Sequence, residues 1–262
     1  GAKIDFEILY PYIESFRINF KEGFYIYVNK PGVLIHSPFF NSIISILLKI
    51  YNNLTVINIS YLLLCSILPF IFYLIIKAKY KLTNDYIFYI SLVIFISPYF
   101  RSSSIWLLGD NLAIIFFSLS TLFFIKSCGE KNNLKNNFLC LFFLILCSYV
   151  RYYYCVYALF FLFYFYQDLS KKNFILLLIF SFIFSTPALI YFYYIIEYHN
   201  FLSVIFNFGK LNIYSNILII LSIFLFYLIP IVIFNWKSVL LYFCKNFLFF
   251  FIILSSIMII YL

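Results

Sequence analysis

The feature that most constrains this chain is the recurrence of long apolar runs along almost its whole length. The stretch NFILLLIFSFIFSTPALIYFYYII, residues 173–196, is apolar on every face of a helix. A membrane β-barrel would instead show short segments of alternating polarity. The mean hydropathy of +1.04 lies far above the globular range, so the runs predict α-helices that cross a lipid bilayer.

The sequence therefore predicts an all-α fold: a polytopic transmembrane helix bundle that forms one domain over residues 1–262. About eight spans are expected. The predicted spans are residues 56–77, 86–98, 105–125, 138–150, 152–167, 174–195, 214–235 and 239–262. Several are shorter than the roughly 20 residues that cross a bilayer unaided, so their boundaries are approximate.

Basic residues distinguish the two sides of this bundle. Nine lysines lie in alternate connections: Lys77, Lys79, Lys81, Lys126, Lys131, Lys135, Lys171, Lys172 and Lys237. The other connections hold only Arg101, Arg151 and Lys210. Because cytoplasmic loops carry an excess of Lys and Arg, the lysine-rich connections are expected to be cytoplasmic. The net charge of +9 is thus a topology signal, and no nucleic-acid partner is expected.

This orientation places residues 1–55 in one long external loop. Residues 33–51 could form a span, but His36, Pro38 and Lys49 favour a helix that lies along the membrane interface. A chain cannot start on the external side without an earlier span or a cleaved signal, so a first transmembrane helix ahead of Gly1 is expected. The protein is expected in the plasma membrane or the endoplasmic reticulum, in contact with membrane lipids.

The isolated polar residues fall at the external ends of the predicted helices. They are Asp5, Glu7, Glu14, Arg17, His36, Arg101, Asp110, Arg151, Glu197, His199 and Lys210. Ionisable groups at or in a membrane are costly unless they are paired or wet, which makes them candidates for function. For Asp110 and Arg151 the alternative is a buried pair that fixes helix packing, and Arg101 could extend to lipid headgroups.

The opening stretch KIDFEILYPYIESF holds three of the nine acidic residues. Pro11 disfavours helix for Tyr10 and predicts an irregular or extended segment. In an extended segment Asp5 and Glu7 would point the same way, into a common site where a carboxylate can take a proton from a hydroxyl group. The alternative is a solvated loop with ordinary surface acids.

This order of features resembles the GT-C superfamily of membrane glycosyltransferases. The acidic motif would be IDFE (Asp5, Glu7), the first external loop would hold NKPGVLIHSPFF, and SPYFRSSSIWLLGDNLAIIFF would match the second. The turn KPGV and the arginine of VRYYY (Arg151) are similar to features of the dolichyl-phosphate-glucose α-1,2-glucosyltransferases. The acids form D-x-E rather than an adjacent pair, and Lys210 stands where an acid is expected.

The resemblance implies transfer of a sugar from a polyprenyl-phosphate donor to a lipid, glycan or protein acceptor on the non-cytoplasmic face. Asp5 or Glu7 would act as the general base, and Arg101, Arg151 or Lys210 would stabilise the departing phosphate. Asp110 and His36 are expected among the substrate-binding residues. A cofactor is not required, although the two carboxylates could hold Mg²⁺ or Mn²⁺.

Two other functions remain open. A polysaccharide polymerase of the Wzy or EpsG type would also use external arginines, and IDFEILYPY fits its DxxxY-like pattern loosely. A transporter or lipid flippase is the non-enzymatic alternative, because transporters commonly carry Gly- or Pro-broken helices near the midplane. The chain shows no convincing internal repeat and has six glycines, which counts against a transporter.

Overall fold

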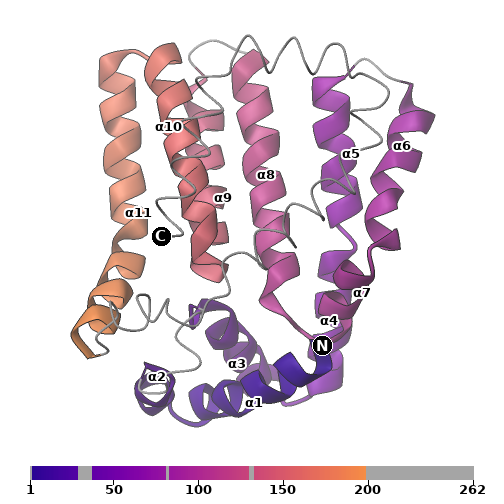
Figure 1. Ribbon diagram of the computed structural model, residues 1–262, viewed down its shortest axis with the longest axis vertical. Helices are drawn as coiled ribbons and strands as arrows, with labels where there is room; N and C mark the ends of the chain where they lie inside the picture. Colours follow the sequence, from indigo (N-terminus) through magenta and orange to yellow (C-terminus); the bar gives the residue numbers. More distant parts are fainter. Residues whose placement is uncertain (1, 29–36, 81–82, 130–132, 199–262) are drawn as a thin grey trace, which may run out of the picture. The chain divides into compact units, whose positions relative to one another are not determined.

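The computed structural model describes residues 2–28, 37–80, 83–129 and 133–198, all within one compact unit, Gly1–His199. These residues form helices joined by short turns, and the described ranges contain no strand (Figure 1). The predicted spans 214–235 and 239–262 lie outside the described residues, as do His36, His199 and Lys210.

Eleven α-helices and two 3₁₀ segments occur in the described ranges. They are α1 (Ala2–Ile18), α2 (Phe20–Val28), α3 (Phe39–Tyr51), α4 (Leu54–Cys65), α5 (Leu68–Lys79), α6 (Asn84–Leu92), η1 (Val93–Ile96), α7 (Pro98–Ile105), α8 (Gly109–Gly129), α9 (Leu134–Val150), η2 (Tyr152–Val156), α10 (Tyr157–Asp168) and α11 (Lys171–Tyr198).

Three of the described helical segments are long and apolar enough to cross a membrane. They are Leu54–Lys79, which joins α4 and α5, Gly109–Gly129 and Lys171–Tyr191. A fourth is counted if Asn84–Ile96 and Pro98–Ile105, which meet at a 65° bend, form one broken span. Six of the eight predicted spans fall in the described part of the chain, so the number found there is smaller than predicted. Of the six predicted in this part of the chain, 138–150 and 152–167 fall on α9 and α10, which have 17 and 12 residues and so fall short of the usual spanning length.

Helices α8 and α9 are antiparallel. Ser120 on α8 donates a 2.8 Å hydrogen bond to the Cys140 carbonyl, and the Cys147 thiol donates one of 3.1 Å to the Ala113 carbonyl. The earlier residue of α8, Ala113, contacts the later residue of α9, Cys147, which shows that the two helices run in opposite directions. The small side chains at these contacts let the two backbones approach closely.

The described lysines of the lysine-rich connections lie in the first or last turns of their helices, at one end of these helices. This end is here called the lysine end (Figure 1, top). Helix α5 finishes with Lys77 and Lys79, α8 has Lys126 in its last turn, α9 has Lys135 in its first, and α11 begins with Lys171 and Lys172. The opposite end, where α8 begins and α9 ends, is called the rim. The described lysine-rich connections therefore lie at the same end of the helices, as the sequence predicted.

The largest buried cluster lies at the rim, where α1 and α3 pack against the starts of α4 and α8. It includes Phe6, Phe40, Tyr61 and Leu108. Gly109 lets α3 come close to α8, because a Cβ atom there would lie 3.0 Å from Val150 Cγ1 and 3.2 Å from Phe40 Cγ. Helix α3 has 13 residues, about 20 Å at 1.5 Å per residue, which is less than the hydrocarbon thickness of about 30 Å.

The expectation of an extended segment around Asp5 and Glu7 is wrong, because α1 is helical from Ala2 to Ile18 with Pro11 inside it. Residues two apart on a helix point about 200° apart, so these carboxylates leave α1 in nearly opposite directions. The cause is tertiary packing. The helix buries Phe6, Ile13 and Phe16 on one side, and this burial outweighs the single backbone hydrogen bond that proline removes.

Candidate functional site

An ion pair between α8 and the end of α9 is the centre of the candidate site. Arg151 Nε donates to Asp110 Oδ1 over 2.6 Å, and each side chain is only 13% exposed. Two other ion pairs occur among the described residues, both within α1 and both more exposed. They are Lys3–Glu7 at 3.8 Å and Glu14–Arg17 at 2.8 Å. The Asp110–Arg151 pair is also the one that joins distant parts of the chain.

Local backbone structure places both partners. Asp110 lies in the first turn of α8, where the positive end of the helix dipole favours a carboxylate. Arg151 is the C-cap of α9, with an extended backbone that turns the chain into η2. The C-terminal end of a helix favours a cation. The dipoles of two antiparallel helices therefore support the same pair.

Asp110 also raises the pKa of Arg151. Burial lowers the pKa of the Arg151 guanidinium, but the hydrogen bond and the negative charge of Asp110 raise it by more, so the pKa lies above its ordinary value. An arginine is a cation at any physiological pH, and the hydrogen bond to Asp110 fixes the orientation of Arg151. A guanidinium held in this way is suited to bidentate recognition of a phosphate or carboxylate.

Tyrosines from three separate elements surround the pair. Tyr99 on α7 lies close enough to Asp110 for the carboxylate charge to act on its hydroxyl group. Tyr153 on η2 and Tyr27 on α2 lie close enough to Arg151 for its charge to act on their hydroxyl groups. Tyr27 is fully buried, whereas Tyr99 and Tyr153 are 57% and 51% exposed. Phenol rings offer both a flat apolar face and a polar group, so Tyr99 and Tyr153 provide surfaces beside the ion pair on which a sugar ring or a lipid headgroup could stack.

The turn before Asp110 is conformationally unusual. Leu107 has a left-handed backbone with φ of 48° and is buried, which costs energy for a residue other than glycine. The neighbouring carbonyl of Leu108 accepts a hydrogen bond from the Tyr61 hydroxyl group. Trp106 packs against Phe6 of α1, with ring centroids 6.4 Å apart. These contacts hold the turn and so position the start of α8.

A buried polar cluster lies directly behind the pair. The Asn111 side-chain amide donates to the Phe100 carbonyl at 2.8 Å and to Ser104 Oγ at 2.7 Å. Asn111 is fully buried, and its Oδ1 atom has no hydrogen-bond partner. Cys65 on α4 lies next to the same amide. The cluster connects α4, α7 and α8 just behind the rim.

Among the residues singled out from the sequence, the structure pairs Asp110 with Arg151 and, within α1, Glu14 with Arg17. Asp5 and Glu7 are exposed on α1, and Arg101 is exposed on α7. Helix α1 nevertheless starts beside the turn that precedes Asp110, because Lys3 Nζ lies 5.9 Å from the centroid of the Trp106 ring. Sequence reasoning missed the tyrosines and Asn111. The RYYY string at Arg151 was the signal for Tyr153, whereas nothing local indicates Tyr27.

The described residues hold no group of three or more His, Cys, Asp or Glu side chains that could bind a metal ion. The ionisable groups that the described residues place at or near the rim include one carboxylate–guanidinium pair, its phenols and the carboxylates of α1. Comparison of the chain with protein-family models, with curated proteins and with solved structures finds no match.

Proposed function

We propose that this chain is a membrane glycosyltransferase that takes a sugar from a polyprenyl-phosphate donor and transfers it to an acceptor at the rim. The observation that carries the proposal is the Asp110–Arg151 pair, 2.6 Å long and 13% exposed, at the end of the helices opposite the lysines. An enclosed ion pair in a membrane-embedded helix bundle is a functional candidate by default. Its guanidinium suits a phosphate, and its tyrosines suit a sugar ring.

In this proposal Arg151 binds the donor phosphate while Asp110 holds the guanidinium in place. A carboxylate of α1 takes the proton of the acceptor hydroxyl group. The acceptor oxygen attacks the anomeric carbon with inversion, the bond from that carbon to the phosphate oxygen breaks, and the lipid phosphate leaves with the electron pair. Its charge is stabilised by Arg151, and Arg101 and Lys210 are further candidates for this role.

The helical geometry of α1 sharpens the choice of base. Asp5 and Glu7 point in nearly opposite directions, so only one of them can face a given acceptor. Glu7 lies 3.8 Å from Lys3, whereas Asp5 has no ion pair among the described residues. We expect Asp5→Asn and Glu7→Gln to differ in their effect on transfer, with one variant abolishing it and the other leaving most of it.

A binding experiment tests the proposal without knowledge of the sugar. The purified protein is titrated with a short-chain polyprenyl phosphate and with the corresponding polyprenol, and the midpoint of thermal unfolding is followed. The phosphate is expected to raise the midpoint and the polyprenol to leave it unchanged. In Arg151→Gln the phosphate effect should disappear, whereas Lys3→Gln on the exposed pair should keep it. Equal shifts by both lipids would overturn the assignment of Arg151.

The interrupted helices favour a second candidate, a lipid flippase or transporter. Leu54–Lys79 changes from α4 to α5 within its length, and the pair α6–η1 and α7 is bent by 65°. Broken helices commonly line transport pathways. Liposomes that contain a fluorescent polyprenyl phosphate distinguish the candidates, because a flippase moves the lipid between leaflets without an acceptor, whereas a transferase changes it chemically. Loss of transfer on replacing Arg101 and Arg151, but not Asp5 or Glu7, would instead favour the polymerase.

A further inference from the structure

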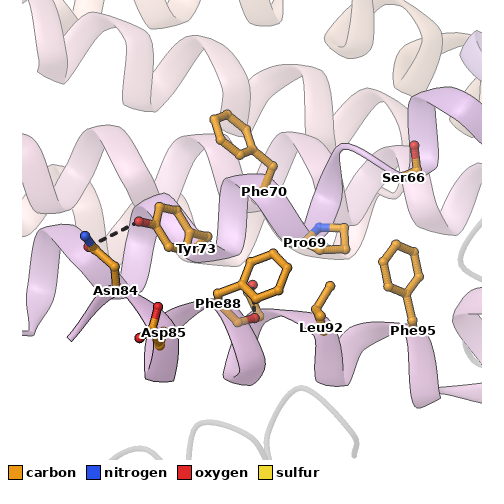
Figure 2. A pocket seen from close by; sticks show the side chains of 10 residues that line it. Ser66, Pro69, Phe70, Tyr73, Asn84, Asp85, Phe88, Leu92 and Phe95 are labelled. Carbon is orange, nitrogen blue, oxygen red and sulfur yellow. Dashed lines mark hydrogen bonds between the residues drawn. The ribbon is translucent and has the colours of Figure 1, made fainter. Parts of the chain in front are cut away.

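A groove runs between α5 and α6, apart from the rim. Its volume is about 540 Å³, and Figure 2 shows the side chains that line it. The lining residues are Ser66, Pro69, Phe70, Tyr73, Asn84, Asp85, Phe88, Ser91, Leu92 and Phe95. Tyr73 lies one turn before Lys77 on α5, and Asn84 and Asp85 begin α6, so one end of the groove is at the lysine end.

The groove follows from interruptions in both helices. Ser66 lies in the break between α4 and α5, and Pro69 follows in the first turn of α5, where the missing N–H of proline is tolerated. Across from them, α6 gives way to η1, which contributes Phe95. The inner end of the groove is therefore bordered by two helix breaks, and its shape is built into the backbone.

The inner part of the groove is mostly apolar. Phe70 and Phe88 are 60% and 52% exposed, and in Figure 2 Pro69, Phe88 and Leu92 lie along the same trough. The distance along α5 from Ser66 to Tyr73 is seven residues, about 10 Å at 1.5 Å per residue. One leaflet contributes about 15 Å of hydrocarbon. The groove therefore matches the chemistry of an acyl chain of the lysine-end leaflet and is long enough to hold about two thirds of its depth.

The outer end of the groove carries one charge of each sign. The Lys77 ammonium lies 5.6 Å from the centroid of the Tyr73 ring, and Asp85 lines the opposite wall. The Tyr73 hydroxyl group donates to Asn84 Oδ1 at 3.3 Å and joins the two walls. Within the described part of the chain neither Lys77 nor Asp85 takes part in an ion pair. A headgroup with a phosphate and an ammonium group complements both charges.

We propose that the groove between α5 and α6 binds one phospholipid with an ethanolamine headgroup from the lysine-end leaflet. The phosphate lies at Lys77, the ammonium at Asp85, and an acyl chain lies between Phe70 and Phe88. Charge complementarity selects this occupant over phosphatidylglycerol, whose headgroup offers Asp85 no cation. The site is separate from the rim and does not depend on the proposed sugar transfer.

Tryptophan quenching by brominated lipids tests the proposal directly. Trp106 and Trp236 are replaced by Phe, and Phe88→Trp provides the reporter in the groove. The matched control is Phe182→Trp on α11, which is 67% exposed and lies outside the groove. Each protein is reconstituted in mixtures in which either phosphatidylethanolamine or phosphatidylglycerol carries the bromine. The thermal midpoint of every variant shows whether it is folded.

At Phe88→Trp, brominated phosphatidylethanolamine is expected to quench tryptophan fluorescence at a two- to fivefold lower mole fraction than brominated phosphatidylglycerol. A partly exposed ion pair contributes about 0.4–1 kcal/mol, which corresponds to this ratio. Phe182→Trp should show no preference, and adding Asp85→Asn should remove the preference at Phe88→Trp. Equal quenching by both lipids at the groove would overturn the proposal. So would quenching at Phe182→Trp but none at Phe88→Trp, because lipid would then not enter the groove.

Discussion

Arg151 Nε lies 2.6 Å from Asp110 Oδ1 although the two residues are 41 positions apart in the chain. The contact closes the helical hairpin of α8 and α9 at the rim, where α8 starts and α9 ends. Both side chains are largely withdrawn from water, so each compensates the desolvation of the other. The pair can therefore be essential for structure, for function, or for both, and these roles respond differently to mutation.

Removal of one partner leaves the other charge enclosed and unpaired. We expect Asp110→Asn and Arg151→Gln each to lower the free energy of unfolding by about 3 kcal/mol, measured in the same detergent. The double variant should lose clearly less than the sum of the two single losses, because no charge is then stranded. Lys3→Gln, on an exposed pair, should change stability by less than about 1 kcal/mol. Additive losses would contradict an energetic coupling between Asp110 and Arg151.

Helix α2 approaches the end of α1 too closely for a side chain at Gly23. An added Cβ would lie 2.6 Å from Phe16 N and 2.8 Å from Ser15 C, which are backbone atoms. Gly23→Ala should therefore lower the free energy of unfolding by about 1–3 kcal/mol. Gly129→Ala is the control, because a Cβ there meets nothing within 4 Å, and it should be neutral or stabilising by up to about 1 kcal/mol. Similar midpoints of thermal unfolding for the two variants would refute the close approach.

The Asn111 amide connects α8 to α7 through the Phe100 carbonyl and Ser104. Asn111→Ala removes both hydrogen bonds from a fully buried position and should lower the free energy of unfolding by about 1–3 kcal/mol. Ser148→Ala removes a single bond to the Leu144 carbonyl within α9 and should cost less. Thermal unfolding of the two variants side by side checks this ordering, and the reverse ordering would show that the Asn111 contacts contribute little.

Two native cysteines report on the orientation in the membrane. Cys128 is exposed in the last turn of α8 at the lysine end, and Cys155 is exposed in η2 at the rim. In sealed cells that carry Cys244→Ser, a membrane-impermeant maleimide should label Cys155 directly and Cys128 only after permeabilisation. The variants Cys128→Ser and Cys155→Ser identify each signal. Labelling of Cys128 in sealed cells would invert the topology and place the rim in the cytosol.

Much of the helical architecture could be predicted from the chain alone. Apolar runs bounded by lysines predict helices, and their alternation predicts which helix ends lie together, because lysines avoid the hydrocarbon and are retained on one side. In the part of the chain that the structure describes, six spans were predicted, and three or four helical segments are long and apolar enough to cross a membrane. Residues 138–150 and 152–167 have the composition of spans, but α9 and α10 end where Arg151 and Leu169 take extended backbones, and composition does not encode those ends.

The sequence by itself determined that this is a helical, strongly apolar chain with few charges, and it identified Asp110 and Arg151 as conspicuous among them. Tertiary structure decided that these two meet, that Tyr27, Tyr99 and Tyr153 approach them from three elements, and that α1 is a helix despite Pro11. The physical reason is that residue type determines the cost of leaving water, which a sequence reveals directly. Which partner offsets that cost depends on helix packing between residues far apart in the chain.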